Sequence, residues 1–279
     1  MPATRQAARL VAGGAALLVG AVLADSALEH YRGSFDNRAM PAPLVGSALA
    51  LGVDTALAAT GSITPLAMSV HAASAALGTA GLGFHAWNIG KQVGGVRWGT
   101  LFYQAPIGAP AALVLAGGLG AAAQVLASGK GALGPVSLLS GRALAGVCAA
   151  GIAGTAAEAA LLHFRGAFQH PAMWVPVTVP PVTALCLAGA ALPGPTRRRR
   201  ATWRTTRFLL DACTWLGALG MAFHARGIAR QMGGWRNWSQ NVLAGPPLPA
   251  PPSFSALALA GRAALALRAA QEGKHREAA

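Results

Sequence analysis

Long apolar stretches alternate along the chain with short polar, proline- or glycine-containing connections. A helix needs roughly 20 mainly apolar residues to cross a hydrocarbon core about 30 Å thick. Stretches of about that length occur at residues 8–28, 42–60, 63–86, 106–128, 142–163, 172–193, 207–225 and 251–268. Their glycine and alanine content suits close helix packing in lipid. The pattern predicts an all-α fold, a polytopic membrane helix bundle with eight transmembrane helices.

The composition favours the same class of protein. The chain is 54% hydrophobic and only 11% charged, against about 25% charged residues in soluble domains. The net charge is +14, but the basic residues are scattered among apolar stretches, so we expect no nucleic-acid partner. Cys148, Cys186 and Cys213 lie in apolar stretches without a C-x-x-C neighbour, which argues against a disulfide framework or a zinc site.

The sequence contains an internal repeat. Residues 8–40 align without a gap to residues 141–173 and are identical at 13 of 33 positions. This argues against reading the first apolar stretch as a secretory signal, because a cleaved leader would have no internal copy. A second motif, Phe84-His85, returns as Phe223-His224, and Gln92 and two glycines follow in both copies as Gln231 and its glycine pair. Two tandem units of four helices are predicted, and an even number per unit makes them parallel repeats about a pseudo-twofold axis along the membrane normal.

Counting Lys and Arg in the connections predicts the orientation. With a cytoplasmic N-terminus, 14 of the 22 basic residues lie on the inner side, as the positive-inside rule requires. We therefore expect an inner-membrane protein with both termini in the cytoplasm. The expected segments are a first four-helix repeat (1–129), the first half of the second repeat (130–192), a basic cytoplasmic loop (193–206), the second half of the second repeat (207–270) and a cytoplasmic tail (271–279).

The two units share histidines and acids near the outer ends of their odd-numbered helices. Imidazole and carboxylate groups suit iron, copper or zinc, and imidazole also suits haem. The candidate metal or haem ligands are His30, His85, His163, His224, Asp25 and Glu158. An acid and a histidine five residues apart point about 140° apart on a continuous helix. They can share a metal only if the helix ends or bulges between them.

Three arrangements of these residues are open. Each unit could supply two histidines and one carboxylate, as in a facial triad. His85 and His224 could instead approach across the axis as axial ligands of a b-type haem. Alternatively, the histidines could simply hydrogen-bond to helix ends at the interface.

Basic residues are also duplicated on the outer side, where the orientation rule disfavours them. These candidate anion-binding residues are Arg32, Arg165, Lys91, Arg230, Arg97 and Arg236. They could contact haem propionates, lipid phosphates or an anionic substrate, or pair with nearby acids.

Asp54, His71 and Asp211 lie in apolar stretches and form a possible proton path, since an intramembrane acid is a functional candidate. Neither acid has a counterpart in the other unit.

These patterns predict a redox or metal-handling membrane subunit that binds metal or b-type haem, beside a periplasmic or membrane redox partner. The alternative is a transporter or lipid-handling carrier for an anionic substrate, with helices interrupted at prolines such as Pro180 and Pro181. A third possibility is a structural membrane scaffold. The chain lacks the sequence motifs of nucleophile elbows, zinc proteases and nucleotide loops, so no catalytic residue is indicated.

Overall fold

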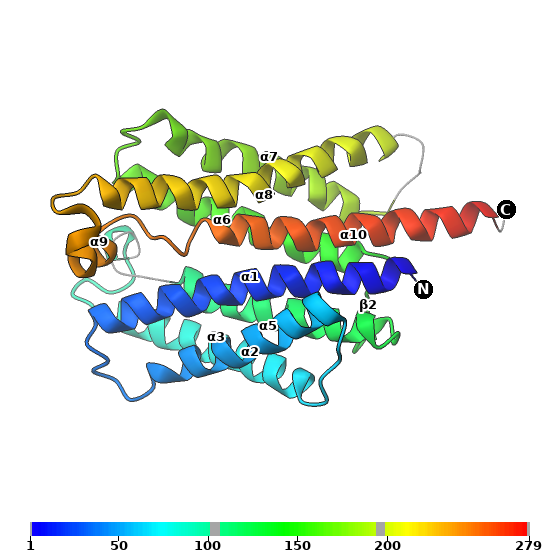
Figure 1. Ribbon diagram of the computed structural model, residues 1–279, viewed down its shortest axis with the longest axis horizontal. Helices are drawn as coiled ribbons and strands as arrows, with labels where there is room; N and C mark the ends of the chain where they lie inside the picture. Colours follow the sequence, from blue (N-terminus) through cyan, green and yellow to red (C-terminus); the bar gives the residue numbers. More distant parts are fainter. Residues whose placement is uncertain (1, 101–106, 194–198, 278–279) are drawn as a thin grey trace.

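The computed structural model describes residues 2–100, 107–193 and 199–277, and its long helices run side by side along one axis (Figure 1). The long helices of this part of the chain are α1 (Pro2–Arg32), α2 (Pro41–Thr60), α3 (Ala67–Gly90), α5 (Gly108–Ala127), α6 (Arg142–Arg165), α7 (Val175–Ala191), α8 (Arg199–Ala229) and α10 (Pro252–Glu277). The shorter elements are a hairpin of β1 (Ala132–Leu133) and β2 (Val136–Ser137), the 3-10 turns η1 (Pro171–Trp174) and η2 (Gly234–Asn237), and α9 (Trp238–Ala244).

The all-α class is confirmed, and a long helix occupies most of each predicted apolar stretch. Two boundaries differ from the expected ones. Residues 199–206 of the expected basic loop already belong to α8, while residues 194–198 lie outside the described part of the chain. The helix α10 runs into the expected tail. The expectation of an interruption at Pro180 and Pro181 was wrong, because both lie inside the uninterrupted α7.

Six of the described helices are long and apolar enough to cross a membrane: α1, α2, α5, α6, α8 and the run of η1 with α7. The helix α3 carries His71 and several serines and glycines, and α10 carries Arg262 and Arg268. Large apolar side chains are exposed on the outer helices, for example Leu185 on α7 and Phe208 on α8. An exposed apolar surface of this kind fits a lipid environment. The chain is a multi-pass membrane protein.

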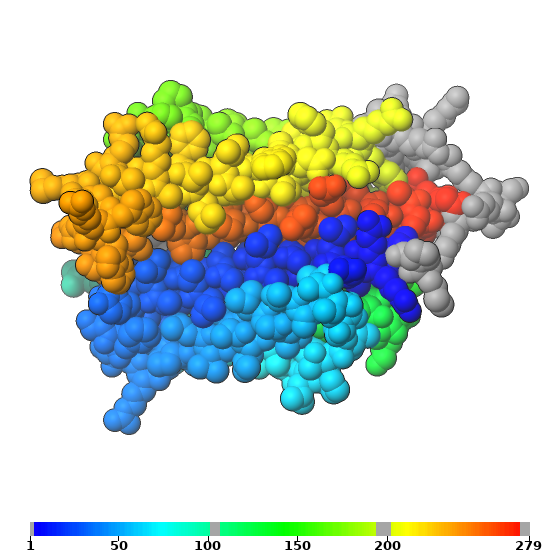
Figure 2. Space-filling model, viewed as in Figure 1, coloured from blue at the N-terminus to red at the C-terminus, as the bar shows by residue number. Residues whose placement is uncertain are grey.

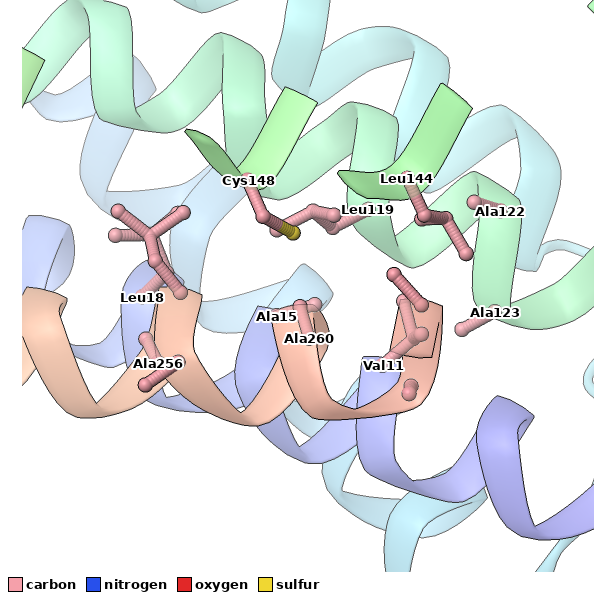
Figure 3. Close-up of a cluster of buried hydrophobic side chains, with 14 of the residues drawn as sticks. Val11, Ala15, Leu18, Leu119, Ala122, Ala123, Leu144, Cys148, Ala256 and Ala260 are labelled. Atoms are coloured by element: carbon pink, nitrogen blue, oxygen red, sulfur yellow. The ribbon is translucent and has the colours of Figure 1, made fainter. Parts of the chain in front are cut away.

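The core lies where four helices meet. In Figure 1, α1 and α10 run side by side through the centre, and they contact α5 and α6 respectively. Figure 3 shows Val11 of α1, Leu119 of α5, Cys148 of α6 and Ala260 of α10 directed into one cluster. The crossing of α1 and α10 is very close, since a Cβ atom at Gly14 would lie 2.5 Å from the carbonyl oxygen of Ala256.

The remaining helices form two outer groups. The helices α2 and α3 pack on α1 and α5, and α7 and α8 pack on α6 and α10. Figure 2 shows the resulting halves lying against each other along the molecule. We call α1, α2, α3 and α5 the first half, and α6, α7, α8 and α10 the second half.

Several contacts recur in both halves. Arg9 Nε donates to the Ala58 carbonyl oxygen at 2.8 Å, and Arg142 Nε donates to that of Ala191 at 2.9 Å. Proline carbonyl groups also pack on glycines in the same way. A Cβ at Gly78 would lie 2.7 Å from the Pro110 oxygen, and one at Gly217 would lie 2.8 Å from the Pro251 oxygen.

We name the two ends of the bundle by what they carry. At the histidine end, on the left of Figure 1, α1, α3, α6 and α8 finish and α9 lies. At the terminal end, on the right, α1 begins and α10 finishes.

Candidate functional site at the histidine end

Four helices bring the candidate histidines to one end of the bundle. His30 and His163 lie in the last turns of α1 and α6. His85 and His224 lie about five residues before the ends of α3 and α8, or roughly 8 Å at 1.5 Å per residue. All four side chains are half-buried.

Three of these imidazoles are held by backbone carbonyl groups. The Nδ1 atoms of His30 and His163 lie 2.8 Å from the carbonyl oxygens of Met40 and Met173, and His224 Nδ1 lies 2.7 Å from that of Pro247. A carbonyl oxygen only accepts, so Nδ1 carries the proton in each ring. In the neutral imidazole, Nε2 then keeps its lone pair. This is the orientation in which a metal-binding histidine presents Nε2.

A sharp turn follows α1 and another follows α6, and these turns bring the carbonyl groups of Met40 and Met173 to the two histidines. Ser34 and Phe35 have φ values of 56° and 49°, and Ala167 and Phe168 have values of 54° and 47°. Residues other than glycine rarely adopt this left-handed backbone conformation. In both turns the phenylalanine N–H donates to the histidine carbonyl, and its ring meets the imidazole edge to face. The turn and the imidazole therefore hold each other in place.

The histidines are associated within each half. His85 interacts electrostatically with His30, and His224 interacts electrostatically with His163. Each half therefore has its own histidine pair. The approach of His85 to His224 across the axis stays a prediction.

The acids lie apart from the histidines. The helices α1 and α6 run unbroken through the acid and histidine positions, so Asp25 and His30 point about 140° apart. Asp25 interacts electrostatically with Glu29, with Glu158 of the other half and with Arg32. The Glu158 carboxylate lies against Gly108, the first residue of α5, where the helix dipole favours an anion. Among the described residues, no three His, Cys, Asp or Glu side chains form a group that could hold a metal ion.

The six candidate anion-binding residues are all exposed at the histidine end. Arg32 Nη1 lies 3.0 Å from Glu29 Oε1, and Lys91 Nζ lies 5.0 Å from the centre of the Trp87 ring. Arg97 folds over the turn at Gly94. Arg165, Arg230 and Arg236 occupy corresponding places in the second half.

Arg32 also lines an open hollow. Its volume is about 510 Å³, and its other lining residues are Tyr31, Ser34, Phe35 and Leu243. Tyr31, Arg32, Ser34 and Phe35 belong to the end of α1 and the turn after it, and Leu243 belongs to α9. The hollow therefore lies between the end of α1 and α9 at the histidine end.

The expected proton-path residues do not form one chain. His71 Nε2 lies 3.4 Å from Asp54 Oδ1, and both side chains are fully buried in the first half. Asp211 lies in the second half, where its Oδ1 forms an ion pair with Arg262 Nη1 at 2.9 Å, and both side chains are partly exposed. Asp211 is thus a partner of Arg262 and not of the buried pair.

Sequence reasoning missed four participants. The carbonyl groups of Met40, Met173 and Pro247 carry no signal in residue identity, because any residue supplies a carbonyl oxygen. Gln124 was missed because it is one polar residue in the apolar stretch that forms α5, yet its side chain is buried and its amide atoms have no hydrogen-bond partner in the described part of the chain. Comparison with protein-family models, curated proteins and solved structures returned no match to this chain.

Proposed function

We propose that the protein is an inner-membrane protein of eight membrane spans, made of two tandem parallel four-helix units. The gapless sequence repeat, the paired Arg9 and Arg142 contacts and the paired proline–glycine contacts support two copies of one unit. The excess of basic residues favours a cytoplasmic terminal end. The histidine end then faces the periplasm.

We further propose that each histidine pair binds a metal centre, so that the protein serves as a redox or metal-handling subunit. The observation that carries this proposal is the hydrogen bond from Nδ1 to a backbone carbonyl in His30, His163 and His224, which leaves Nε2 as the ligand atom. Two imidazoles in each half, with no third protein ligand among the described residues, would suit a haem iron better than a tetrahedral zinc site.

The chain would supply three things to a b-type haem. His30 with His85, and His163 with His224, would hold the iron. Arg32 and Arg165 follow His30 and His163 by two residues and would contact the propionates. The haem, when bound, would supply one-electron transfer. The exposed histidine end would then meet a periplasmic or membrane redox partner.

The test is an optical spectrum and an elemental analysis of the full chain purified in detergent. Haem ligation gives a haem absorption band with iron in a fixed ratio to protein, and a protein-bound ion gives iron, copper or zinc without that band. His85→Ala combined with His224→Ala removes the band or the metal. A stable, active preparation without colour or metal contradicts the proposal.

The hollow at Arg32 favours a second candidate function, a carrier for an anionic substrate or lipid head group. It combines a guanidinium group with the Tyr31 and Phe35 rings in a space of about 510 Å³. Under this function the His85→Ala, His224→Ala double variant still purifies without a spectral change, and Arg32→Ala lowers the uptake of anions into vesicles.

A further inference from the structure

Three buried polar side chains gather near the terminal end of the first half. Asp54 comes from α2, His71 from α3 and Gln124 from α5, and all three are at most 3% exposed. Asp54 and His71 lie 3.4 Å apart, and a side chain at Gly120 of α5 would collide with both. Gln124 lies one turn further along the same face of α5. The three residues therefore share one region between α2, α3 and α5.

This region contains unsatisfied hydrogen-bonding groups. The carboxylate oxygens of Asp54, the ring nitrogens of His71 and the amide atoms of Gln124 have no hydrogen-bond partner in the described part of the chain. A buried polar group without a partner costs about 1–3 kcal/mol, and a charged one more. Packing alone does not account for three such residues in one place.

The second half fills the corresponding region with leucines. A Cβ at Gly261 of α10 would lie 3.0 Å from a methyl carbon of Leu210 on α8 and 3.1 Å from one of Leu187 on α7. Gly261 thus packs against residues of α7 and α8 in the second half, just as Gly120 packs against residues of α2 and α3 in the first half. Leu265 follows Gly261 by four residues, as Gln124 follows Gly120. The second half packs this region without polar side chains. The polar set of the first half therefore serves something other than folding.

The chemistry of this set suits a proton. A carboxyl group and an imidazole 3.4 Å apart can share one proton with no net charge, and a further proton gained or lost changes the buried charge by one unit. The helices α2, α3 and α5 present no other titratable side chain to the pair. On α1, Arg9 is exposed and donates to the Ala58 and Ala59 carbonyl groups at the end of α2.

The position of the set gives a short route to water. His71 is four residues from the start of α3, about 6 Å at 1.5 Å per residue. Gln124 is three residues from the end of α5 and so lies between the pair and the terminal end. Its amide group can both donate and accept a hydrogen bond. It can therefore link the pair to water at the end of the bundle in one chain of hydrogen bonds.

We propose that Asp54 and His71 form a proton-binding site that exchanges with water at the terminal end through Gln124, and that only the first half carries it. The site is independent of the histidine pairs at the opposite end. The proton-binding site can therefore be tested separately from metal or haem binding.

Infrared difference spectroscopy of the full chain in lipid vesicles tests this site. A pH step should change the C=O band of a protonated carboxyl group, and deuterated water should shift that band. Asp54→Asn should abolish the change, and Gln124→Leu should slow the shift. Asp211→Asn is the matched control and should leave the change intact, since Asp211 is held by Arg262.

A triple variant keeps the test valid if Asp54→Asn folds poorly. Asp54→Leu, His71→Leu and Gln124→Leu together copy the packing of the second half and should stay helical by circular dichroism while losing the band. The proposal is overturned if the wild-type band does not respond to pH or if it persists in the triple variant. It is also overturned if Asp211→Asn removes the band equally.

Discussion

At the residue scale, the histidine end depends on hydrogen bonds that fix ring orientation. His30 and His163 bind carbonyl groups of residues ten positions later, and the left-handed turns between them make this possible. The histidines, their spacing and their duplication could be predicted from the sequence. Their partners could not, because the hydrogen bonds depend on φ values at Ser34 and Ala167 that neither residue type favours.

Removing one histidine should affect one half only. His30→Ala or His163→Ala should each lower the bound haem or metal by about half, because each pair lies within one half. Haem absorbance or metal content per protein measures this. The control is His170→Asn, since Asn37 occupies the corresponding position in the first half. Each side chain there accepts a hydrogen bond from the backbone N–H two residues later. Complete loss from either single variant would mean that one shared centre joins the halves.

Replacing the buried polar set should stabilise the fold. Exchange of a buried ion pair for packed apolar residues is often neutral or stabilising by about 1–4 kcal/mol, whereas removal of one partner costs about 3–5 kcal/mol. We expect Asp54→Leu, His71→Leu and Gln124→Leu together to raise the midpoint of thermal unfolding in detergent. Asp54→Leu alone should lower it. A triple variant that unfolds below the wild type would contradict the equivalence of this region with Leu187, Leu210 and Leu265.

At the element scale, hydropathy located the helices but not their ends. Membrane-length apolar stretches predict the part of a helix inside lipid, whereas a helix continues for as long as its backbone hydrogen bonds do. The helices α8 and α10 extend into arginine- and glutamate-containing segments, and these residues are good helix formers. Pro180 and Pro181 leave α7 unbroken where it packs on α6 and α8. Tertiary packing therefore overrides the local signal.

The crossing of α1 and α10 should tolerate no side chain at Gly14. Gly14→Ala places a Cβ 2.5 Å from the Ala256 oxygen and 3.3 Å from the Ala260 Cβ. Overpacking of this kind costs about 1–3 kcal/mol. The adjacent Gly13 is the matched control, because its nearest contact, the Ala58 Cβ, is 3.9 Å away. We expect Gly14→Ala to lower the unfolding midpoint and Gly13→Ala to leave or raise it. Equal effects would show that the crossing is not closely packed there.

At the scale of the whole molecule, the repeat gives the components of each half but not their exact arrangement. The contact of α1 with α10 is extensive, whereas that of α5 with α6 is slight. An exact twofold axis would make these two contacts equal. The halves therefore meet unevenly, and the sequence gives no sign of this because the helices involved are similarly rich in Gly and Ala.

The proposed orientation can be tested with two exposed lysines at opposite ends. Lys91 follows α3 at the histidine end, and Lys130 follows α5 at the terminal end. Each is replaced by cysteine in a variant in which Cys148, Cys186 and Cys213 are changed to alanine. A membrane-impermeant maleimide added to cells with an opened outer membrane should label Lys91→Cys at once, and Lys130→Cys only after the inner membrane is permeabilised. This outcome follows from the 14 basic residues expected on the cytoplasmic side. The reverse result would place the histidine end in the cytoplasm, and immediate labelling of both would mean that the bundle does not separate two compartments.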